Sequence, residues 1–388
     1  MSISDKRIEY GSDKAADKQK AMRASGNIDA EFLELANKVY AHLNDEISKK
    51  IFEARFKYAT EKDLSYITGL ESNYRNLNSD MQVFAEKIRQ GPCLIYGAGV
   101  AGHYLAGRFK QFGVKIEAFI DPDESKGPVD EQTGIKVITE KELGENKALY
   151  DGKTLIISYP VKPVADGVRK RLVYDIGIDE KNVTTAIFDL RNNQGQYFDF
   201  FEAGEHEVFV DCGCFDGSTC FNFAGWCGHK GYDHIYSFEA DPKNYEKSKE
   251  VLSSLGKCDL YPYGTSDAKK KVYFAADAFE TSSIISREDA EKRNFEGVEE
   301  IETVALDDVL SGKKVTFIKM DIEGAEYEAL LGARTLIMEN RPRMAISVYH
   351  KFEDFVTLAD LVLQMQPDYR ISYRHYAFDD LETVMYVE

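Results

Sequence analysis

Three acidic residues stand where predicted β-strands end in the second half of the chain: Asp211, Glu239 and Asp321. The carboxyl ends of parallel strands meet at one edge of a sheet, and ligands of such sheets bind at that edge. One acid at a strand end often only caps the following helix, but three in register indicate a ligand site. A carboxylate at the second of these positions, Glu239, can accept both hydrogen bonds from a ribose diol.

Glycines follow the first of these acids. The run from Val208 to Gly217 reads Val-Phe-Val-Asp-Cys-Gly-Cys-Phe-Asp-Gly. Gly213 and Gly217 carry no side chain, so a ligand can press against the backbone there. The interval from Asp211 to Glu239 has room for a full strand–helix–strand unit. The pattern therefore predicts contact with a ligand at the first turn of this sheet.

A second glycine-rich turn lies in the first half of the chain. Gly97-x-Gly99-x-x-Gly102 follows the predicted strand Cys93–Tyr96 and opens a helix, where backbone amides can approach a phosphate. Asp121 ends the next strand, near the distance at which an acid reaches a ribose hydroxyl. Either a dinucleotide or a nucleotide-sugar binds here, or the glycines only permit a tight turn.

The elements that position these residues divide the chain of 388 residues into four parts. We predict a polar and helical region (1–90), a first α/β domain (91–190), a linker (191–206) and a second α/β domain (207–388). Strands alternate with helices in both α/β domains. This alternation predicts two Rossmann-like, doubly wound parallel sheets.

The N-terminal region is predicted to begin with a loosely ordered polar segment, Met1–Asn27. Ile28–Lys57 carries apolar residues at helical spacing and predicts one long amphipathic helix, and Met81–Arg89 predicts another. These helices either pack on the domain that follows them or form the face of a homo-oligomer.

Seven strands are predicted in the second domain: Glu207–Asp211, His234–Glu239, Asp259–Tyr263, Thr316–Asp321, Met344–His350, Tyr369–Tyr376 and Thr383–Glu388. A short acidic turn joins the last two, which favours an antiparallel pair. Lys269–Lys271 is expected to be the solvated end of a hairpin. Asp277–Gly297 is expected to be either a lid over the site or a long surface loop.

A family resemblance becomes visible around the third acid. The run from Lys319 to Glu326, Lys-Met-Asp-Ile-Glu-Gly-Ala-Glu, with Val304–Leu310 before it, resembles the FkbM-type methyltransferases. The resemblance spans Glu207–His350. It implies a seven-stranded class I methyltransferase sheet and an S-adenosylmethionine-dependent enzyme. It further implies that the methyl group is transferred to an oxygen atom of a sugar or sugar-containing metabolite.

The same resemblance assigns residues to the parts of S-adenosylmethionine. It implies that Asp211 and Gly213 border the methionine part. Glu239 would hold the ribose, and the segment from Gly264 to Asp267 would lie along the adenine. Asp321 would sit beside the amino group and the transferred methyl group.

Two positions depart from the family's pattern. Cys214-Phe215 replaces the usual Ala-Asn of the first loop, and the strand Ile346–His350 lacks the carboxylate often found before the family's histidine. A neutral sugar hydroxyl is a poor nucleophile, so a general base assists its methylation. His350 is the first candidate for this base, and Asp321 is the second.

A metal site is a further possibility, with ligands from Asp321, Glu323, Glu326 and His350. Hard carboxylate oxygens with one imidazole suit magnesium or manganese. The two glutamates more often cap and solubilise the helix that begins there. The leading interpretation therefore places no metal in the site.

Composition limits the remaining classes. The net charge of -18 disfavours nucleic acid as a partner. No apolar run is long enough to span a bilayer, and the N-terminal segment has no signal core. Cys212-x-Cys214 lacks the spacing of a zinc-binding pair. We expect a cytoplasmic protein with reduced, buried thiols that acts on a small-molecule or glycan acceptor.

Two alternative functions stay open. Cys93–Ser158 loosely resembles the N-terminal domain of bacterial sugar acyltransferases, through Phe119–Asp123 and Gly134–Ile138. With NAD(P) bound there, the protein would be a nucleotide-sugar oxidoreductase, although no Tyr-x-x-x-Lys set accompanies the turn. The other alternative is a non-catalytic assembly protein with a degenerate cofactor pocket, which the unusual Cys214-Phe215 favours.

Overall fold

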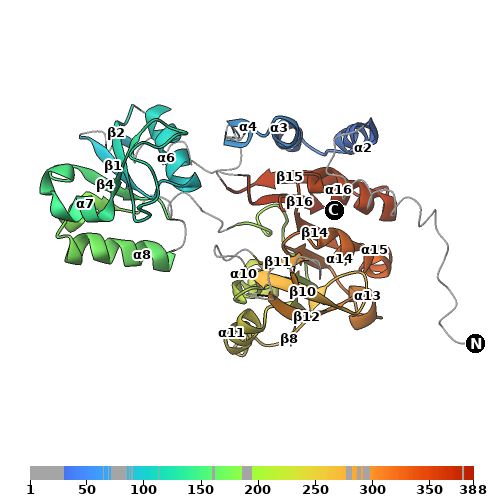
Figure 1. Ribbon diagram of the computed structural model, residues 1–388. Helices are drawn as coiled ribbons and strands as arrows, with labels where there is room; N and C mark the ends of the chain where they lie inside the picture. The colour runs from blue at the N-terminus through green and yellow to red at the C-terminus, as the bar shows by residue number, and fades with distance from the viewer. Residues whose placement is uncertain are drawn as a thin grey trace, which may run out of the picture. The chain divides into compact units, whose positions relative to one another are not determined.

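The computed structural model of the chain describes residues 30–63, 65–68, 70, 85–86, 88, 91–111, 113–159, 162–185, 195–276, 282–285, 290–291, 298–377 and 380–388 (Figure 1). The chain forms two compact units. One comprises Glu71–Gln194, and the other joins Met1–Leu70 to Gly195–Glu388. The polar segment Met1–Asn27 and most of the expected helix Met81–Arg89 lie outside the described residues.

The unit of Glu71–Gln194 is built on a parallel five-stranded sheet with the order β3-β2-β1-β4-β5. Its strands are β1 (Cys93–Tyr96), β2 (Ile116–Asp121), β3 (Lys136–Thr139), β4 (Thr154–Ile157) and β5 (Val183–Thr184), and its α-helices are α6 (Val100–Gln111), α7 (Glu140–Glu145) and α8 (Lys162–Lys170). Alternate residues of β1 enter two different cores, Ile95 on one face and Leu94 on the other. Burial on both faces explains why this strand is apolar throughout.

The other unit contains a seven-stranded sheet with the order β15-β16-β14-β13-β6-β7-β8. Its strands are β6 (Glu207–Cys212), β7 (Tyr232–Phe238), β8 (Cys258–Tyr261), β13 (Phe317–Met320), β14 (Arg343–Ser347), β15 (Ile371–His375) and β16 (Thr383–Val387). Only the pairs that involve β16 are antiparallel in this sheet, as the short final turn predicts. The predicted fold class, two doubly wound sheets of which the second is seven-stranded, is confirmed.

Helices cover both faces of the seven-stranded sheet. They are α10 (Ser218–Cys227), α11 (Pro242–Leu252), α13 (Leu306–Val309), α14 (Glu326–Leu331), α15 (Arg334–Asn340) and α16 (Asp354–Met365). Alternate residues of β6 point to opposite faces: Val210 joins the core beneath α14–α16, and Phe209 joins the core beneath α10. The two cores fix the strand ends between them, at the edge where ligands of such sheets bind.

A small sheet adjoins this fold, with the order β11-β10-β12-β9. Its strands are β9 (Gly264–Thr265), β10 (Lys270–Ala276), β11 (Ser282–Ile285) and β12 (Val298–Val304). Lys270 and Lys271, expected at the end of a hairpin, instead begin β10 and pair with β12. Of the expected lid or loop Asp277–Gly297, only residues 282–285 and 290–291 are described.

The N-terminal helices belong to the seven-stranded unit. The single helix expected over Ile28–Lys57 is two helices, α2 (Ala30–Ala41) and α3 (Glu46–Glu61), followed by the short α4 (Ser65–Thr68). After the break between the two helices, Asp45 caps the start of α3: its side chain accepts the Ser48 backbone N–H at 2.7 Å. Figure 1 shows α2 and α3 beside α16 and β15.

One of the two alternatives for these helices was that they pack on the domain that follows them, but α2 and α3 instead pack within the C-terminal unit. Phe32 of α2 and Phe52 of α3 share a core with Phe355 of α16, and the Phe52 and Phe355 ring centroids lie 4.9 Å apart. Their apolar stripe is therefore completed by residues from the far end of the sequence. Within this packing the apolar stripe of the helices serves the parent fold, and a homo-oligomer through these helices stays a prediction.

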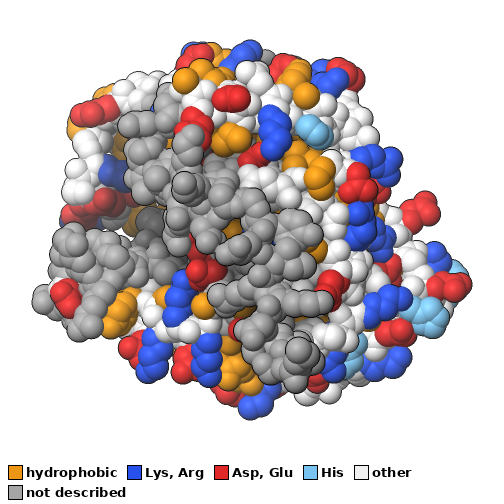
Figure 2. Space-filling view, turned by 90° about the vertical axis from the view of Figure 1, so that its right-hand side faces the viewer, with side chains coloured by type: hydrophobic (Ala, Val, Ile, Leu, Met, Phe, Trp, Pro, Cys, Tyr) orange, Lys and Arg blue, Asp and Glu red, His pale blue; other side chains and the backbone are white. Residues whose placement is uncertain are grey.

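Surface charges are mixed rather than gathered. Figure 2 shows Lys and Arg side chains intermingled with Asp and Glu on one face. Exposed ion pairs such as Lys271–Glu300 and Arg341–Asp368, both at 2.6 Å, contribute little stability each. The fold thus depends on its apolar cores. Within the described part of the chain, none of the helices has the length and apolar character needed to cross a membrane.

Candidate active site

Three neighbouring strands end at one edge of the seven-stranded sheet, although β6 continues past its predicted end at Asp211 to Cys212. β6 lies between β7 and β13, and all three run parallel. Cys212 pairs in register with both Phe238 and Met320, the last residues of the neighbouring strands. The next residue of each strand therefore emerges at the same level. These residues are Gly213, Glu239 and Asp321.

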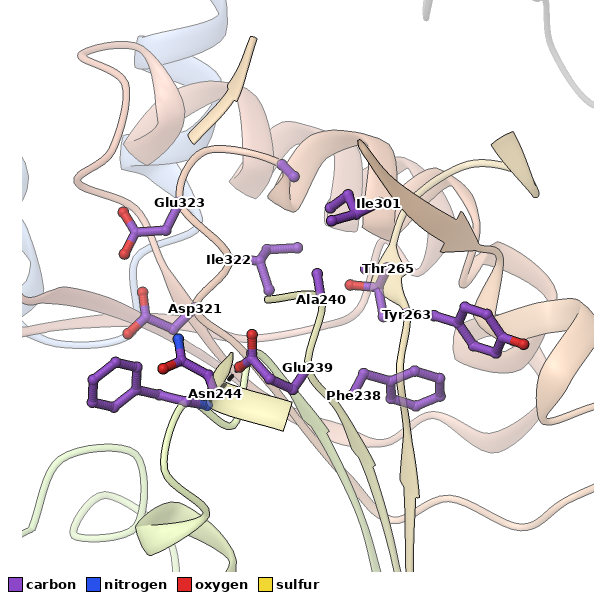
Figure 3. Close-up of a pocket in the computed structure, with 14 residues that line it drawn as sticks. Phe238, Glu239, Ala240, Asn244, Tyr263, Thr265, Ile301, Asp321, Ile322 and Glu323 are labelled. Carbon is purple, nitrogen blue, oxygen red and sulfur yellow. Dashed lines mark hydrogen bonds between the residues drawn. The ribbon is translucent and has the colours of Figure 1, made fainter. Parts of the chain in front are cut away.

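A cavity of about 110 Å³ opens at this edge. Gly213, Glu239, Gly264, Thr265, Asp321 and Glu323 are among the residues that line it. In Figure 3 the carboxylates of Asp321 and Glu323 lie on one side, Thr265, Tyr263 and Phe238 lie on the other, and Glu239 lies between them. The cavity thus has an acidic end and a more apolar end.

Glu239 is fixed by the turn that it faces. One carboxylate oxygen accepts the Phe215 backbone N–H at 2.8 Å, and the other accepts the Asp241 N–H at 2.9 Å. Burial raises the pKa of Glu239, and these two hydrogen bonds oppose the rise. A carboxylate has about four lone-pair sites, so Glu239 keeps capacity for two further donors. It can still accept a diol in the cavity.

Gly213 is the glycine that the cavity requires. Its φ is +81°, and a Cβ at this position would lie 2.2 Å from the carbonyl oxygen of Asp321. Gly217 also has a positive φ, but it precedes α10, packs against Leu252 and is not among the cavity-lining residues. The first glycine therefore shapes the cavity, and the second shapes the start of a helix.

Asp211 was expected to border the methionine part of a cofactor, but its side chain is fully buried and does not line the cavity. Its Oδ1 lies 3.1 Å from Nζ of Lys319, its register partner on β13. Lys319 also donates to the carbonyl oxygen of Gly213 at 2.5 Å. Burial alone would lower the pKa of Lys319, but the charges of Asp211 and Asp321 raise it above its usual value. Asp211 thus acts through Lys319, which holds the glycine turn.

Asp321 lies between two tyrosines at the acidic end of the cavity. The Tyr197 hydroxyl donates to Oδ2 at 2.6 Å, and the Tyr349 hydroxyl donates to Oδ1 at 3.2 Å. Burial would raise the pKa of Asp321, but His350, Lys319 and the Tyr197 hydrogen bond bring it below its usual value. Asp321 is therefore an anion that accepts hydrogen bonds from hydroxyl groups.

Sequence reasoning missed Tyr197, because it falls in the segment that was expected to be only a linker. That segment contains the aromatic run Gln-Tyr-Phe-Asp-Phe-Phe from Gln196 to Phe201, and so many aromatic residues are unusual for a solvated linker. Phe198 and Phe201 are buried against Phe317 of β13, which fixes the segment beside the site. This composition was the signal available.

His350 lies beyond the end of β14, among carboxylates. Its Nδ1 is 3.0 Å from Oε1 of Glu326, and its Nε2 is 3.4 Å from Asp321 and 3.5 Å from Glu323. These are ion-pair contacts without straight hydrogen-bond geometry. Burial lowers the pKa of His350, but the surrounding carboxylates outweigh it and raise the pKa to about 10. Burial also raises the pKa of Glu323, to about 7. Unlike Asp321 and Glu323, His350 is not among the cavity-lining residues.

Asp267 was expected to lie along the adenine, but it is not among the residues that line the cavity. Its carboxylate accepts hydrogen bonds from neighbouring side chains instead. Lys270 donates to its carboxylate at 2.6 Å, and Ser266 donates at 3.0 Å. Burial raises the pKa of Asp267, but these partners lower it overall. Gly264 and Thr265 of the same segment do line the cavity. The segment therefore reaches the site through β9 rather than through Asp267.

The glycine turn of the other unit is held by its own residues. Gly97 has a φ of +102°, and a Cβ on Gly102 would lie 1.9 Å from the Gly97 carbonyl oxygen. Gly99 has nothing within 4 Å of such a position. Asp121 accepts the Ala98 backbone N–H and the Lys126 ammonium, both at 2.8 Å. Tight packing accounts for Gly97 and Gly102 but not for Gly99, and a nucleotide in this unit stays a prediction.

The seven-stranded order with an antiparallel closing pair, and a cavity at the carboxyl ends of its central strands, define a class I methyltransferase fold. Residues 211–384 match the family model of the methyltransferase FkbM domain. The C-terminal part of the chain is thus similar to the FkbM methyltransferases. No curated protein matches the chain.

Several solved structures are similar to the chain. Methyltransferase FkbM from Methylobacillus flagellatus KT shares 18% identity with a TM-score of 0.47, over 88% of this chain and 99% of that chain. An rRNA methylase from Streptococcus thermophilus shares 13% with a TM-score of 0.30, over 48% and 87% of the two chains. Fibrillarin from Aeropyrum pernix, crystallised with natively bound S-adenosyl-L-methionine, shares 13% with a TM-score of 0.31, over 51% and 72%.

Proposed function

We propose that the C-terminal unit transfers the methyl group of S-adenosylmethionine to a hydroxyl of a sugar or sugar-containing metabolite. The observation that carries this proposal is the alignment of Gly213, Glu239 and Asp321 around one cavity, within a methyltransferase FkbM domain. The resemblance of the sequence to its family favours oxygen as the methylated atom.

The cavity residues suit the parts of S-adenosylmethionine. The free lone pairs of Glu239 can accept the two ribose hydroxyls. Gly264 and Thr265, at the less acidic end, would lie along the adenine. The anionic Asp321 and the bare backbone of Gly213, where any Cβ would clash, leave the other end for the methionine part and its positive charges.

S-adenosylmethionine supplies a methyl group already activated on a sulfonium, so the protein's task is alignment and exclusion of water. As the carbon–sulfur bond breaks and the carbon–oxygen bond forms, the acceptor hydroxyl loses its proton. We assign the proton to Asp321, because Asp321 lines the cavity and already accepts hydrogen bonds from two hydroxyls.

His350, the first candidate from the sequence, has a different role in this proposal. Its ring faces Glu326, Asp321 and Glu323, and it is not among the residues that line the cavity. Its nitrogens are thus engaged by carboxylates rather than offered to an acceptor. We assign His350 the role of a positioning residue, which holds the carboxylates of Asp321 and Glu323 in place through its ion-pair contacts.

Turnover tests this function. The protein is incubated with S-adenosylmethionine and a panel of nucleotide-sugars and free sugars, and products are identified by mass spectrometry. The proposal expects S-adenosylhomocysteine together with a product heavier by one methylene on oxygen. Cofactor binding without turnover on any sugar acceptor would favour an assembly protein, and a methylated nitrogen would refute the proposed O-methylation.

A further inference from the structure

Three carboxylates and one imidazole meet beside the cavity. We call Asp321, Glu323, Glu326 and His350 the acidic cluster. Asp321, Glu326 and His350 each offer one ligand atom, and these atoms all lie within 4.8 Å of one another. Glu323 is 3.5 Å from the same imidazole, and its side chain is 41% exposed. The acidic cluster therefore joins a buried core to the open cavity.

Charge in the acidic cluster is poorly balanced by protein groups. Three carboxylates face a single imidazole, which carries at most one positive charge. The charge of Lys319 also acts on Asp321, but its ammonium is shared with Asp211 and the Gly213 carbonyl oxygen. Lys351 donates to the Gly324 carbonyl oxygen at 2.5 Å. Concentrated negative charge in a desolvated site is costly unless a cation compensates it.

Glu326 supplies an independent observation. Its side chain is fully buried, and Oε1 accepts the Ile322 backbone N–H at 2.9 Å. Oε2 is buried as well, yet it has no hydrogen-bond partner within the described part of the chain. An unsatisfied buried carboxylate oxygen costs free energy. Its presence inside the acidic cluster points to a positive ligand there.

We propose that the acidic cluster binds one divalent metal ion, with ligands from Asp321, Glu326 and His350 and with Glu323 on the cavity side. Hard carboxylate oxygens with a single imidazole suit Mn²⁺ or Mg²⁺. As the ion binds, the His350 imidazole releases its proton to solvent and becomes a neutral ligand. The ion then balances the charge of the carboxylates in place of that proton and provides a partner for Oε2 of Glu326. Binding of the ion does not depend on the methyltransferase proposal.

The role of the ion does rest on the proposed function. Asp321 and Glu323 line the cavity, so coordination positions left open by the protein face it. An acceptor hydroxyl can occupy such a position. A bound divalent ion orients and polarises that oxygen, which favours acceptors with neighbouring hydroxyls that coordinate together.

Electron paramagnetic resonance of Mn²⁺ titrated into the metal-free full chain tests the site. The proposal expects one ion bound per chain at micromolar to sub-millimolar concentration. Glu326→Gln and Glu323→Gln should each weaken this binding by about tenfold or more. Glu339→Gln, an exposed position on α15, is the matched control and should bind Mn²⁺ as the wild type does.

Glu326 is buried, so Glu326→Gln could weaken Mn²⁺ binding simply by disturbing the fold. Glu323→Gln separates the two causes, because Glu323 is partly exposed and its substitution leaves the core intact. No Mn²⁺ binding by the wild type, or binding that both variants retain, would overturn the metal site. S-adenosylmethionine is titrated separately, in the presence of a chelator. Cofactor binding without Mn²⁺ binding refutes only the metal, and the reverse result refutes only the proposed function.

Discussion

At the scale of single residues, Gly213 shapes the turn that faces the cavity. Its φ of +81° is one that side chains with a Cβ rarely adopt, and the clashing atom is a backbone oxygen that cannot rotate away. Gly213→Ala is expected to lower the free energy of unfolding by about 1–3 kcal/mol and to weaken S-adenosylmethionine binding. Thermal unfolding and calorimetric titration measure the two effects.

Gly225 offers the control for this substitution. It lies on an exposed part of α10, its φ is ordinary, and nothing lies within 4 Å of a Cβ built there. Gly225→Ala should leave binding unchanged and raise helix stability slightly. If the two substitutions have equal effects on the protein, the account of the glycine turn is wrong.

The sequence identifies the strand-end residues but not where their side chains point. The spacing of Asp211, Glu239 and Asp321 predicts that all three lie near one edge, because strand ends can be located from apolar runs. In the folded sheet Asp211 lies before that edge, in register with Lys319 and Ser237. The spacing does not show that Asp211 turns inward, because that depends on Lys319 lying opposite it on a neighbouring strand more than a hundred residues away. Cross-strand partners are set by the register of the folded sheet.

At the scale of elements, Asp45 joins α3 to the sheet. It caps α3 and contacts the Arg374 guanidinium of β15 at 3.1 Å. Burial would raise the pKa of Asp45, but the Ser48 and Arg374 hydrogen bonds lower it overall. A lowered folded-state pKa gives stability above the unfolded pKa of about 3.9, and that stability is lost as pH falls through the folded pKa.

Asp45→Asn keeps a capping oxygen but removes the charge. The variant should be less stable than wild type by about 0.5–1 kcal/mol near pH 7, and the difference should vanish as pH falls through the lowered folded-state pKa of Asp45. Urea denaturation at a series of pH values measures it. Asp241→Asn, at the cap of α11, lacks a described ion pair and should show a smaller loss. A difference that persists unchanged at low pH would show that the charge is not the cause.

Element-level expectations fail where tertiary partners decide the outcome. Helical periodicity identifies Ile28–Lys57 as helical, but it does not show the break at Asp45, which is fixed by contacts with β15. The Tyr373 backbone N–H donates to Ser48 across a separation of 325 residues. Likewise, the segment from Gln196 to Phe201 becomes part of the site because Phe317 and its neighbours provide a place to bury it. Local pattern carries no information about such distant partners.

At the scale of the whole molecule, the two units offer separate nucleotide-type turns. In the unit of Glu71–Gln194, Asp121 and Lys126 bind each other and both bind the backbone of Ala98, so they occupy the hydrogen-bonding groups of the glycine turn. In the other unit Glu239 keeps free acceptor sites beside a cavity. Hydrogen exchange with and without S-adenosylmethionine should therefore show added protection confined to residues 195–388. Protection gained within residues 91–185 instead would move the cofactor to the other sheet.

The central claim is that the cavity at the ends of β6, β7 and β13 binds S-adenosylmethionine through Glu239. Isothermal titration calorimetry of the full chain tests it most directly, with Glu250→Gln, an exposed position on the helix α11 that follows Glu239, as the control. The account predicts one binding site, unchanged in the control. It also predicts an affinity about 10- to 100-fold weaker in Glu239→Gln, because hydrogen bonds to a charged acceptor contribute about 1.5–3 kcal/mol. No binding by the folded wild type, or equal binding by Glu239→Gln, would contradict it.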